Sequence, residues 1–150
     1  MGSWTRRLSK RFPDAEITGI DISAERLAIA RNRMGHRPNV KMIRMNGEAL
    51  EFEDGSFDFV YSSHALEQME AVIDQALAEI ARVARGRVVL IEPVYELAGL
   101  AQRLYSRKQG YVRSLLRAIR KTDLTVVEMF VRGVQLNPLN QSTVIVLQKK

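Results

Sequence analysis

The chain has 150 residues, of which 46% are hydrophobic and 27% are charged, and this composition predicts one globular domain spanning residues 1–150. It contains no cysteine, which excludes disulfides, thiolate metal ligands and a cysteine nucleophile. No apolar run approaches the roughly 20 residues that cross a bilayer, and the first residues lack the apolar core of a signal peptide. We therefore expect a cytoplasmic protein with no transmembrane segment and no metal site.

The net charge of +6 comes from one segment. Residues 97–122 carry seven basic side chains and no acidic one, interleaved with leucines at helical spacing. Four interpretations stay open: a solvated helical face, the cover of an acidic acceptor, a contact with an anionic membrane, or a nucleic-acid contact. Nucleic acid is disfavoured, because only Tyr105 and Tyr111 are present there for base stacking.

Strands and helices alternate along most of the chain. This pattern predicts an α/β, Rossmann-like, doubly wound and mostly parallel sheet with helices on both faces, closed by an antiparallel C-terminal hairpin through a loop at 137–140. The predicted strands are 16–21, 40–45, 57–62, 87–91, 124–131 and 143–147. The predicted helices are 4–11, 24–34, 70–84 and 97–121, the last with a break at Gly110.

The most informative stretch is the strand that ends in Asp21. In α/β nucleotide-binding folds a carboxylate at this position accepts hydrogen bonds from ribose hydroxyls, about 20 residues after a glycine-rich turn. Here that turn falls near Gly2. The alternative is that Asp21 only caps the helix that follows, beside Ser23.

Four local motifs occur in one order, and together they cover about residues 2–95. The motifs are Ile17-Thr18-Gly19-Ile20-Asp21-Ile22-Ser23, Asn46-Gly47-Glu48-Ala49-Leu50-Glu51-Phe52 with Asp54-Gly55-Ser56-Phe57-Asp58, Ser62-Ser63-His64-Ala65-Leu66-Glu67-Gln68, and Glu79-Ile80-Ala81-Arg82-Val83. In this order they resemble the class I S-adenosylmethionine-dependent methyltransferases, in particular the branch that acts on small molecules.

The resemblance is incomplete at the N-terminus. The family opens with an apolar strand and a Gly-x-Gly-x-Gly loop, of which only Gly2 has a counterpart, so the first strand is expected to be missing. That strand lies between 16–21 and 57–62 in the family, and its loss exposes two strand edges. Asn46 stands where an aspartate is usual, and the Pro-Gly-Gly turn before the fifth strand is shortened to Ala84-Arg85-Gly86.

The resemblance also implies a set of site residues. Those expected to bind S-adenosylmethionine are Gly2, Asp21, Ile22, Asn46, Gly47 and Ser62. His64 is the candidate general base or acceptor-orienting residue, although a structural histidine is the competing interpretation. Glu67 and Glu92 are expected at the same rim, as site residues or as solvated carboxylates.

The function implied is methyl transfer from S-adenosylmethionine to a small-molecule acceptor, by a subunit that another chain completes as a homo- or hetero-oligomer. Two alternatives stay open. One is a non-catalytic, methyltransferase-like subunit that stabilises or regulates an active partner, and the other is a nucleic-acid-binding module. The acceptor and its methylated atom are not predicted.

Overall fold

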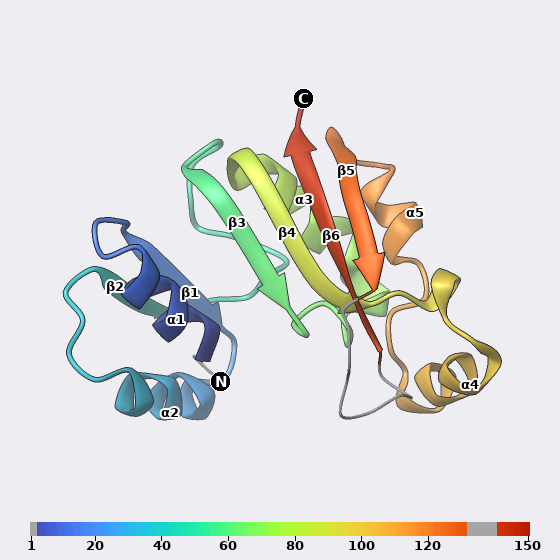
Figure 1. Ribbon diagram of the computed structural model, residues 1–150, viewed down its shortest axis with the longest axis horizontal. Helices are drawn as coiled ribbons and strands as arrows, with labels where there is room; N and C mark the ends of the chain where they lie inside the picture. The colour runs from blue at the N-terminus through green and yellow to red at the C-terminus, as the bar shows by residue number, and fades with distance from the viewer. Residues whose placement is uncertain (1–2, 132–140) are drawn as a thin grey trace. The chain divides into compact units, whose positions relative to one another are not determined.

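The computed structural model describes residues 3–131 and 141–150, which form two compact units, residues 3–51 and 52–150. Figure 1 shows the elements of both units. Gly2 and the loop at 137–140 lie outside the described residues.

The first unit is a two-stranded parallel sheet with two helices. Its elements in chain order are α1 (Ser3–Arg11), β1 (Ile17–Asp21), α2 (Ala24–Met34) and β2 (Val40–Arg44). In the register Ile17 is opposite Val40 and Asp21 is opposite Arg44, so both strands end at the same edge. Leu27, Ala30 and Met34 are buried on one face of α2, as their helical spacing predicts.

Gly19 permits the close approach of the two strands in this unit. A Cβ at this position would lie 2.6 Å from the Sδ of Met42 on β2, closer than real Cβ contacts. The short strand β1 therefore packs its neighbour's side chain directly over its own backbone.

The second unit is a four-stranded mixed sheet in the order β3-β4-β6-β5. Its strands are β3 (Phe57–Ser63), β4 (Ala84–Pro93), β5 (Leu124–Val131) and β6 (Ser142–Lys149). Strands β3 and β4 are parallel, while β6 is antiparallel to both β4 and β5. The predicted antiparallel hairpin is therefore confirmed, with β6 inserted between β4 and β5.

Helices of the second unit cover one face of this sheet. Its helical elements are η1 (Glu70–Val72), α3 (Ile73–Val83), η2 (Tyr95–Leu97), α4 (Leu100–Gln109) and α5 (Leu115–Ile119). Helices α3 and α5 lie together behind the sheet in Figure 1 and share its apolar core. None of the helices in residues 3–131 and 141–150 is both long and apolar enough to cross a membrane.

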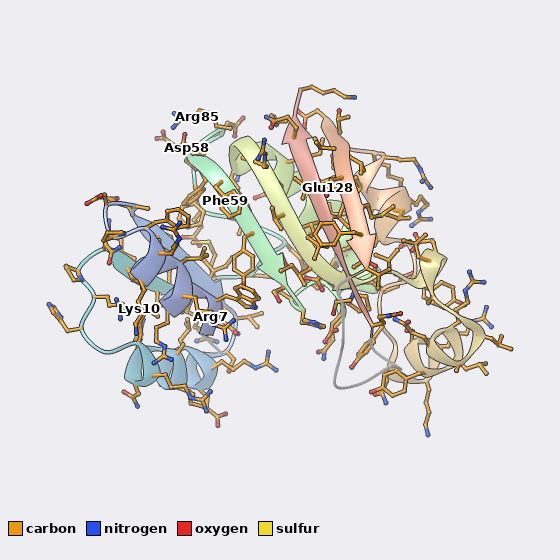
Figure 2. The ribbon with its side chains drawn as sticks, viewed as in Figure 1. Arg7, Lys10, Asp58, Phe59, Arg85 and Glu128 are labelled. Atoms are coloured by element: carbon orange, nitrogen blue, oxygen red, sulfur yellow. The ribbon has the colours of Figure 1, made fainter. Side chains whose placement is uncertain are left out.

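One sequence prediction for this unit is wrong in detail. Ala84-Arg85-Gly86 is not a turn, because α3 runs directly into β4 and these residues form its first part. Phe57 pairs with Ala84 but Phe59 pairs with Arg87, so β4 carries one extra residue, a β-bulge opposite Asp58. The side chains of Asp58 and Arg85 form an ion pair across this bulge (Figure 2).

The predicted helix at 97–121 is two helices. Glycine at 110 has a positive φ of 69°, a left-handed conformation that ends α4, and its N–H donates to the last carbonyls of the helix. The break at Gly110 is confirmed, and residues 110–114 form a connection before α5.

Candidate functional site

Asp21 lies at the carboxyl end of β1, where the chain turns into α2. Its Oδ1 accepts a hydrogen bond from the N–H of Ser23 at 2.9 Å, and the Oγ of Ser23 accepts one from the N–H of Arg26 at 3.2 Å. Ser23 is therefore the N-cap of α2, and Asp21 holds the turn before it. Among the described residues the carboxylate of Asp21 makes no ion pair. One oxygen of an unpaired carboxylate is thus available at a strand end, in the position where α/β sheets bind ligands.

Asn46 and Gly47 follow β2 at the same edge of the sheet as Asp21. The N–H of Met45 donates to the carbonyl of Asp21 at 3.3 Å, which ties the two strand ends together. The Oδ1 of Asn46 accepts from the N–H of Glu48 at 3.2 Å, so the side chain closes a tight turn. Asn46 is exposed and Gly47 is half-buried. The first unit therefore brings Asp21, Asn46 and Gly47 to adjacent strand ends.

Ile22 follows Asp21 and is exposed. Its side chain is 61% exposed, and its carbonyl accepts a hydrogen bond from the Nε of Arg44 at 3.0 Å. The arginine opposite Asp21 in the register thus binds the backbone of the next residue instead of the carboxylate. An aliphatic side chain beside the carboxylate offers an apolar surface at the same strand end.

In the second unit, Ser62 is buried rather than open to a ligand. Its Oγ donates to the Oε1 of Glu92 at 2.8 Å. The hydroxyl on which a cofactor contact depends is therefore engaged inside the protein, and the cofactor role of Ser62 stays a prediction.

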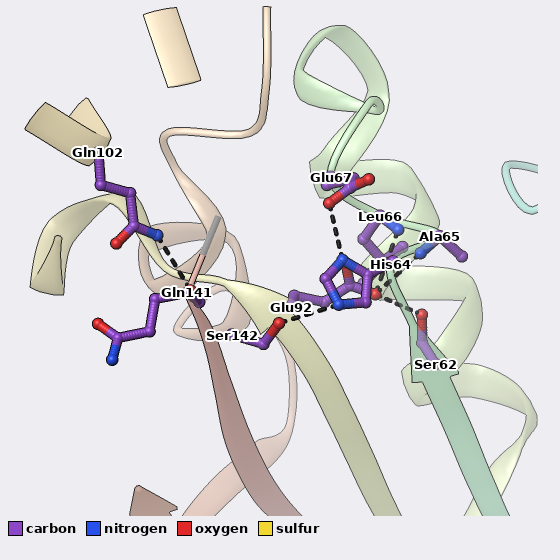
Figure 3. Close-up of polar contacts among 9 residues, drawn as sticks. All are labelled: Ser62, His64, Ala65, Leu66, Glu67, Glu92, Gln102, Gln141 and Ser142. Carbon is purple, nitrogen blue, oxygen red and sulfur yellow. Dashed lines mark hydrogen bonds and ion pairs between the residues drawn. The ribbon is translucent and has the colours of Figure 1, made fainter. Parts of the chain in front are cut away.

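Glu92 lies near the carboxyl end of β4 and is buried. It is 1% exposed, and its Oε1 accepts from the hydroxyl of Ser62 and from the N–H groups of Ala65 and Leu66 (Figure 3). Its Oε2 is also buried and has no hydrogen-bond partner among the described residues. Burial raises the pKa of this carboxyl to about 7, although the three donors and the neighbouring His64 act in the opposite direction. The interpretation of Glu92 as a solvated carboxylate is wrong.

His64 lies at the carboxyl end of β3 in a left-handed conformation, with φ of 53°. Its Nδ1 lies 2.9 Å from the Oε2 of Glu67, and its Nε2 lies 2.9 Å from the Oγ of Ser142 at the start of β6 (Figure 3). Glu67 is half-buried and so is not a freely solvated carboxylate either. A non-glycine residue with positive φ is uncommon and is found often at functional sites, so this backbone is a reason to look for a role.

A shallow hollow lies at the opposite end of the strands of the four-stranded sheet, where β4 begins. The four cations that line it are all paired: Arg82 with Asp54 and Glu79, Arg85 with Asp58, Lys121 with Asp74, and Lys149 with Asp123. This hollow therefore offers no unpaired charge to a ligand.

One member of the site, Ser142, could not be selected from sequence. Ser142 is 78 positions away from His64, and its contact depends on the insertion of β6 beside β4. The burial of Glu92 had a weak signal, because a carboxylate directly after the apolar strand 87–91 is unusual.

Polar residues thus lie at the carboxyl ends of β1 and β2 in the first unit and, separately, at the carboxyl ends of β3 and β4 in the second unit. A family model for a methyltransferase domain matches residues 1–87. The chain belongs to this methyltransferase-domain family.

A demethylmenaquinone methyltransferase of Staphylococcus aureus (strain JH9) is 33% identical over 108 residues. The match covers 70% of this chain but 44% of that relative, so the chain spans less than half the length of the curated relative.

Solved structures share the fold at low sequence identity. The N-methyltransferase NodS from Bradyrhizobium japonicum WM9, in complex with S-adenosyl-L-homocysteine, is 16% identical with a TM-score of 0.78, covering 99% of this chain and 72% of that chain. The [4+2]-cyclase SpnF is 18% identical with a TM-score of 0.73, covering 99% of this chain and 71% of that chain. Because a protein named a cyclase has the same fold, the fold alone does not define the reaction.

Proposed function

We propose that this chain binds S-adenosylmethionine and transfers its methyl group to a small-molecule acceptor, as part of a methyltransferase that another chain completes. The observation that carries the proposal is Asp21: an unpaired carboxylate at the carboxyl end of β1, fixed by Ser23. Family membership and the names of the relatives support the same reaction. We place this reaction in the cytoplasm, in agreement with the absence of cysteine.

We assign the strand ends of the first unit to the nucleoside part of this cofactor. We expect the oxygens of Asp21 to accept hydrogen bonds from ribose hydroxyls, and the N–H of Gly47 and the side chain of Asn46 to contact the adenine edge. Ile22 provides an apolar surface beside them. The cofactor, when bound, supplies a sulfonium methyl group, and the protein supplies binding and orientation.

His64 is the candidate for work on the acceptor. A carboxylate only accepts hydrogen bonds, so a neutral His64 carries its proton on Nδ1 toward Glu67, and its Nε2 accepts from Ser142. We infer that these two contacts fix the ring. When the hydroxyl or amine of a methyl acceptor replaces the Ser142 hydroxyl as the hydrogen-bond partner of Nε2, Nε2 can act as a base.

Completion by another chain is the second part of the proposal. Among the described residues β1 pairs only with β2, and β3 pairs only with β4. Each strand therefore has one edge without a partner, and such edges pair readily with a further strand. We infer that the two units form one methyltransferase-like domain when a second copy or a different chain supplies that strand.

A non-catalytic subunit is the second candidate function. The observation that favours it is that the Oδ1 of Asn46 already accepts from Glu48, in a position where the family usually has a charged acceptor. A carbonyl oxygen accepts a second hydrogen bond, but a neutral amide does so without charge assistance. A subunit with this weaker site stabilises an active partner instead of binding the cofactor itself.

Isothermal titration calorimetry with S-adenosylmethionine separates the two candidates. The protein is titrated together with any chain that co-purifies with it, as wild type and as Asp21→Asn. The asparagine keeps an oxygen for the N–H of Ser23 but loses the charge, so the turn survives while affinity for ribose falls by about tenfold or more. Asp14→Asn, an exposed carboxylate before β1, is the matched control and retains full affinity. Absence of binding by the wild-type assembly supports the non-catalytic subunit.

A further inference from the structure

Helix α4 is amphipathic in the opposite sense to an ordinary surface helix. Its buried residues are Gln102 and Ser106, while Leu100 is 77% exposed and Leu104 is 58% exposed. These two leucines are four positions apart, so they lie on the same face of the helix. Leu97, in η2 just before the helix, is 51% exposed. We refer to Leu97, Leu100 and Leu104 as the leucine ridge.

A polar contact of Gln102 holds the inward face of α4. The Nε2 of Gln102 donates to the carbonyl of Gln141 at 3.0 Å, just before β6 begins. This contact fixes the orientation of the helix, so the leucines face outward because the amide faces inward. Exposure of the ridge is therefore a property of how α4 is anchored within the second unit.

Basic side chains border the leucine ridge on the same helix. Arg103 and Arg107 stand over the ring of Tyr95, with guanidinium carbons 5.6 and 5.8 Å from its centroid. Lys108 is exposed on the other side of Leu104. Residues 97–122 contain no acidic side chain, and the carboxylate of Glu96 just before them binds the N–H of Leu116. Within residues 97–122 the charged side chains that flank the ridge are therefore all basic.

We propose that α4 docks the protein on an anionic lipid bilayer, with the leucine ridge inserted among acyl chains and Arg103, Arg107 and Lys108 contacting the headgroups. Apolar side chains flanked by lysine and arginine on one helix face are the pattern of interfacial helices. The same border repels a second basic copy of this helix, and leucines do not stack on bases as aromatic rings do. Like-charge repulsion therefore disfavours a second copy of this chain, and the apolar ridge favours acyl chains over nucleic acid.

The other apolar surface of this unit does not share that charge pattern. The sheet face away from α3 exposes Phe59, at 49%, and Phe130, at 47%, but Glu128 stands on it between them in the register (Figure 2). A carboxylate opposes contact with anionic lipid. The proposal is therefore specific to α4.

Co-sedimentation of the full chain with vesicles tests this directly. Vesicles of phosphatidylcholine alone are compared with vesicles that contain about 30% phosphatidylglycerol, an anionic lipid. We expect binding to the anionic vesicles and little to the neutral ones. Combined Leu97→Ser, Leu100→Ser and Leu104→Ser should lower the partition coefficient by more than about tenfold. Combined Arg103→Gln, Arg107→Gln and Lys108→Gln should lower it by about fivefold per charge.

Two matched control variants distinguish docking through α4 from non-specific hydrophobic adsorption and from a general effect of net charge. Phe12→Ser, Val127→Ser and Phe130→Ser remove apolar side chains of comparable exposure, and Arg26→Gln, Arg33→Gln and Lys41→Gln remove the same charge elsewhere. Both should retain binding, and circular dichroism checks that every variant is folded. The proposal is overturned by no binding to anionic vesicles, by unchanged binding of the leucine variant, or by an equal loss in the controls. It does not depend on cofactor binding, because the readout is sedimentation with lipid.

Discussion

The Nε2 of His64 lies 2.9 Å from the Oγ of Ser142, although the two residues are 78 positions apart. The other ring nitrogen lies 2.9 Å from Glu67. The ring is thus held from both sides by residues on β6 and on the segment after β3. From the sequence, His64 is either a structural or a catalytic histidine. The two contacts give its ring a defined orientation.

The His64–Ser142 contact predicts a specific protonation pattern. In the neutral form of the imidazole, the ¹⁵N chemical shifts should show the proton on Nδ1, because the carboxylate of Glu67 can only accept. Ser142→Ala should lower the free energy of unfolding by about 1 kcal/mol, since it leaves Nε2 without this donor. Ser56→Ala, an exposed serine, is the control and should change little. A neutral ring that carries its proton on Nε2 in the wild type would contradict the described arrangement.

Burial of Glu92 predicts a pH-dependent stability. The unfolded carboxyl titrates near 4.5 and the folded one near 7, so between these values the unfolded chain releases a proton that the folded protein retains. The free energy of unfolding should therefore fall by on the order of 3 kcal/mol from pH 4.5 to above pH 7 on account of this group.

Chemical denaturation of wild type and Glu92→Gln at several pH values measures this effect. The difference in unfolding free energy between variant and wild type should rise with pH, because the glutamine does not titrate. Glu53→Gln, which replaces an exposed carboxylate, should show a small and flat difference. A Glu92→Gln difference that stays constant over this range would show that the buried carboxyl has an ordinary pKa.

The β-bulge leaves no room for a side chain at Gly86. A Cβ at Gly86 would lie 2.5 Å from the backbone carbonyl oxygen of Asp58, which cannot move without opening the β3–β4 pair. Gly86→Ala should therefore lower the unfolding free energy by about 2 kcal/mol. Gly99→Ala is the matched control, because nothing lies within 4 Å of its Cβ position and its φ is −69°. Equal stability of the two variants would contradict the close approach.

Among the described residues β1 and β3 each have one edge without a partner strand, and these edges predict association. Size-exclusion chromatography with light scattering should give a mass above that of one 17.1 kDa chain, either as an oligomer or with a co-purifying protein. Association of this kind buries the unpaired backbone groups of both strands. A stable, well-folded monomer would rule out completion by another chain.

The elements that the sequence predicts best have local signals at both ends. Helix α2 has the predicted bounds, because Ser23 caps its start and Gly35 ends it with a φ of 67°. Strand β5 likewise has the predicted bounds of Leu124–Val131. For α2 the local capping chemistry is sufficient.

The elements that differ depend on packing. From the sequence, Gly86 is predicted to lie in a turn. In the structure it lies in β4, and its lack of a side chain allows β4 to pass close to the backbone of Asp58. The site shows the same division. Asp21 and Asn46 were identified from short motifs, whereas the contacts of Glu92 with Ser62 and of His64 with Ser142 are long-range and follow only from the strand order.

The central claim is that Asp21 and the turn at Asn46–Glu48 bind the nucleoside of the cofactor. An NMR titration of the ¹⁵N-labelled chain with S-adenosylhomocysteine, in the assembly in which it purifies, tests it residue by residue. We predict saturable shifts of the amides of Ser23, Gly47 and Glu48, which are lost in Asp21→Asn and retained in Asp14→Asn. Saturable binding that leaves these amides unchanged, or no binding at all, would contradict the account.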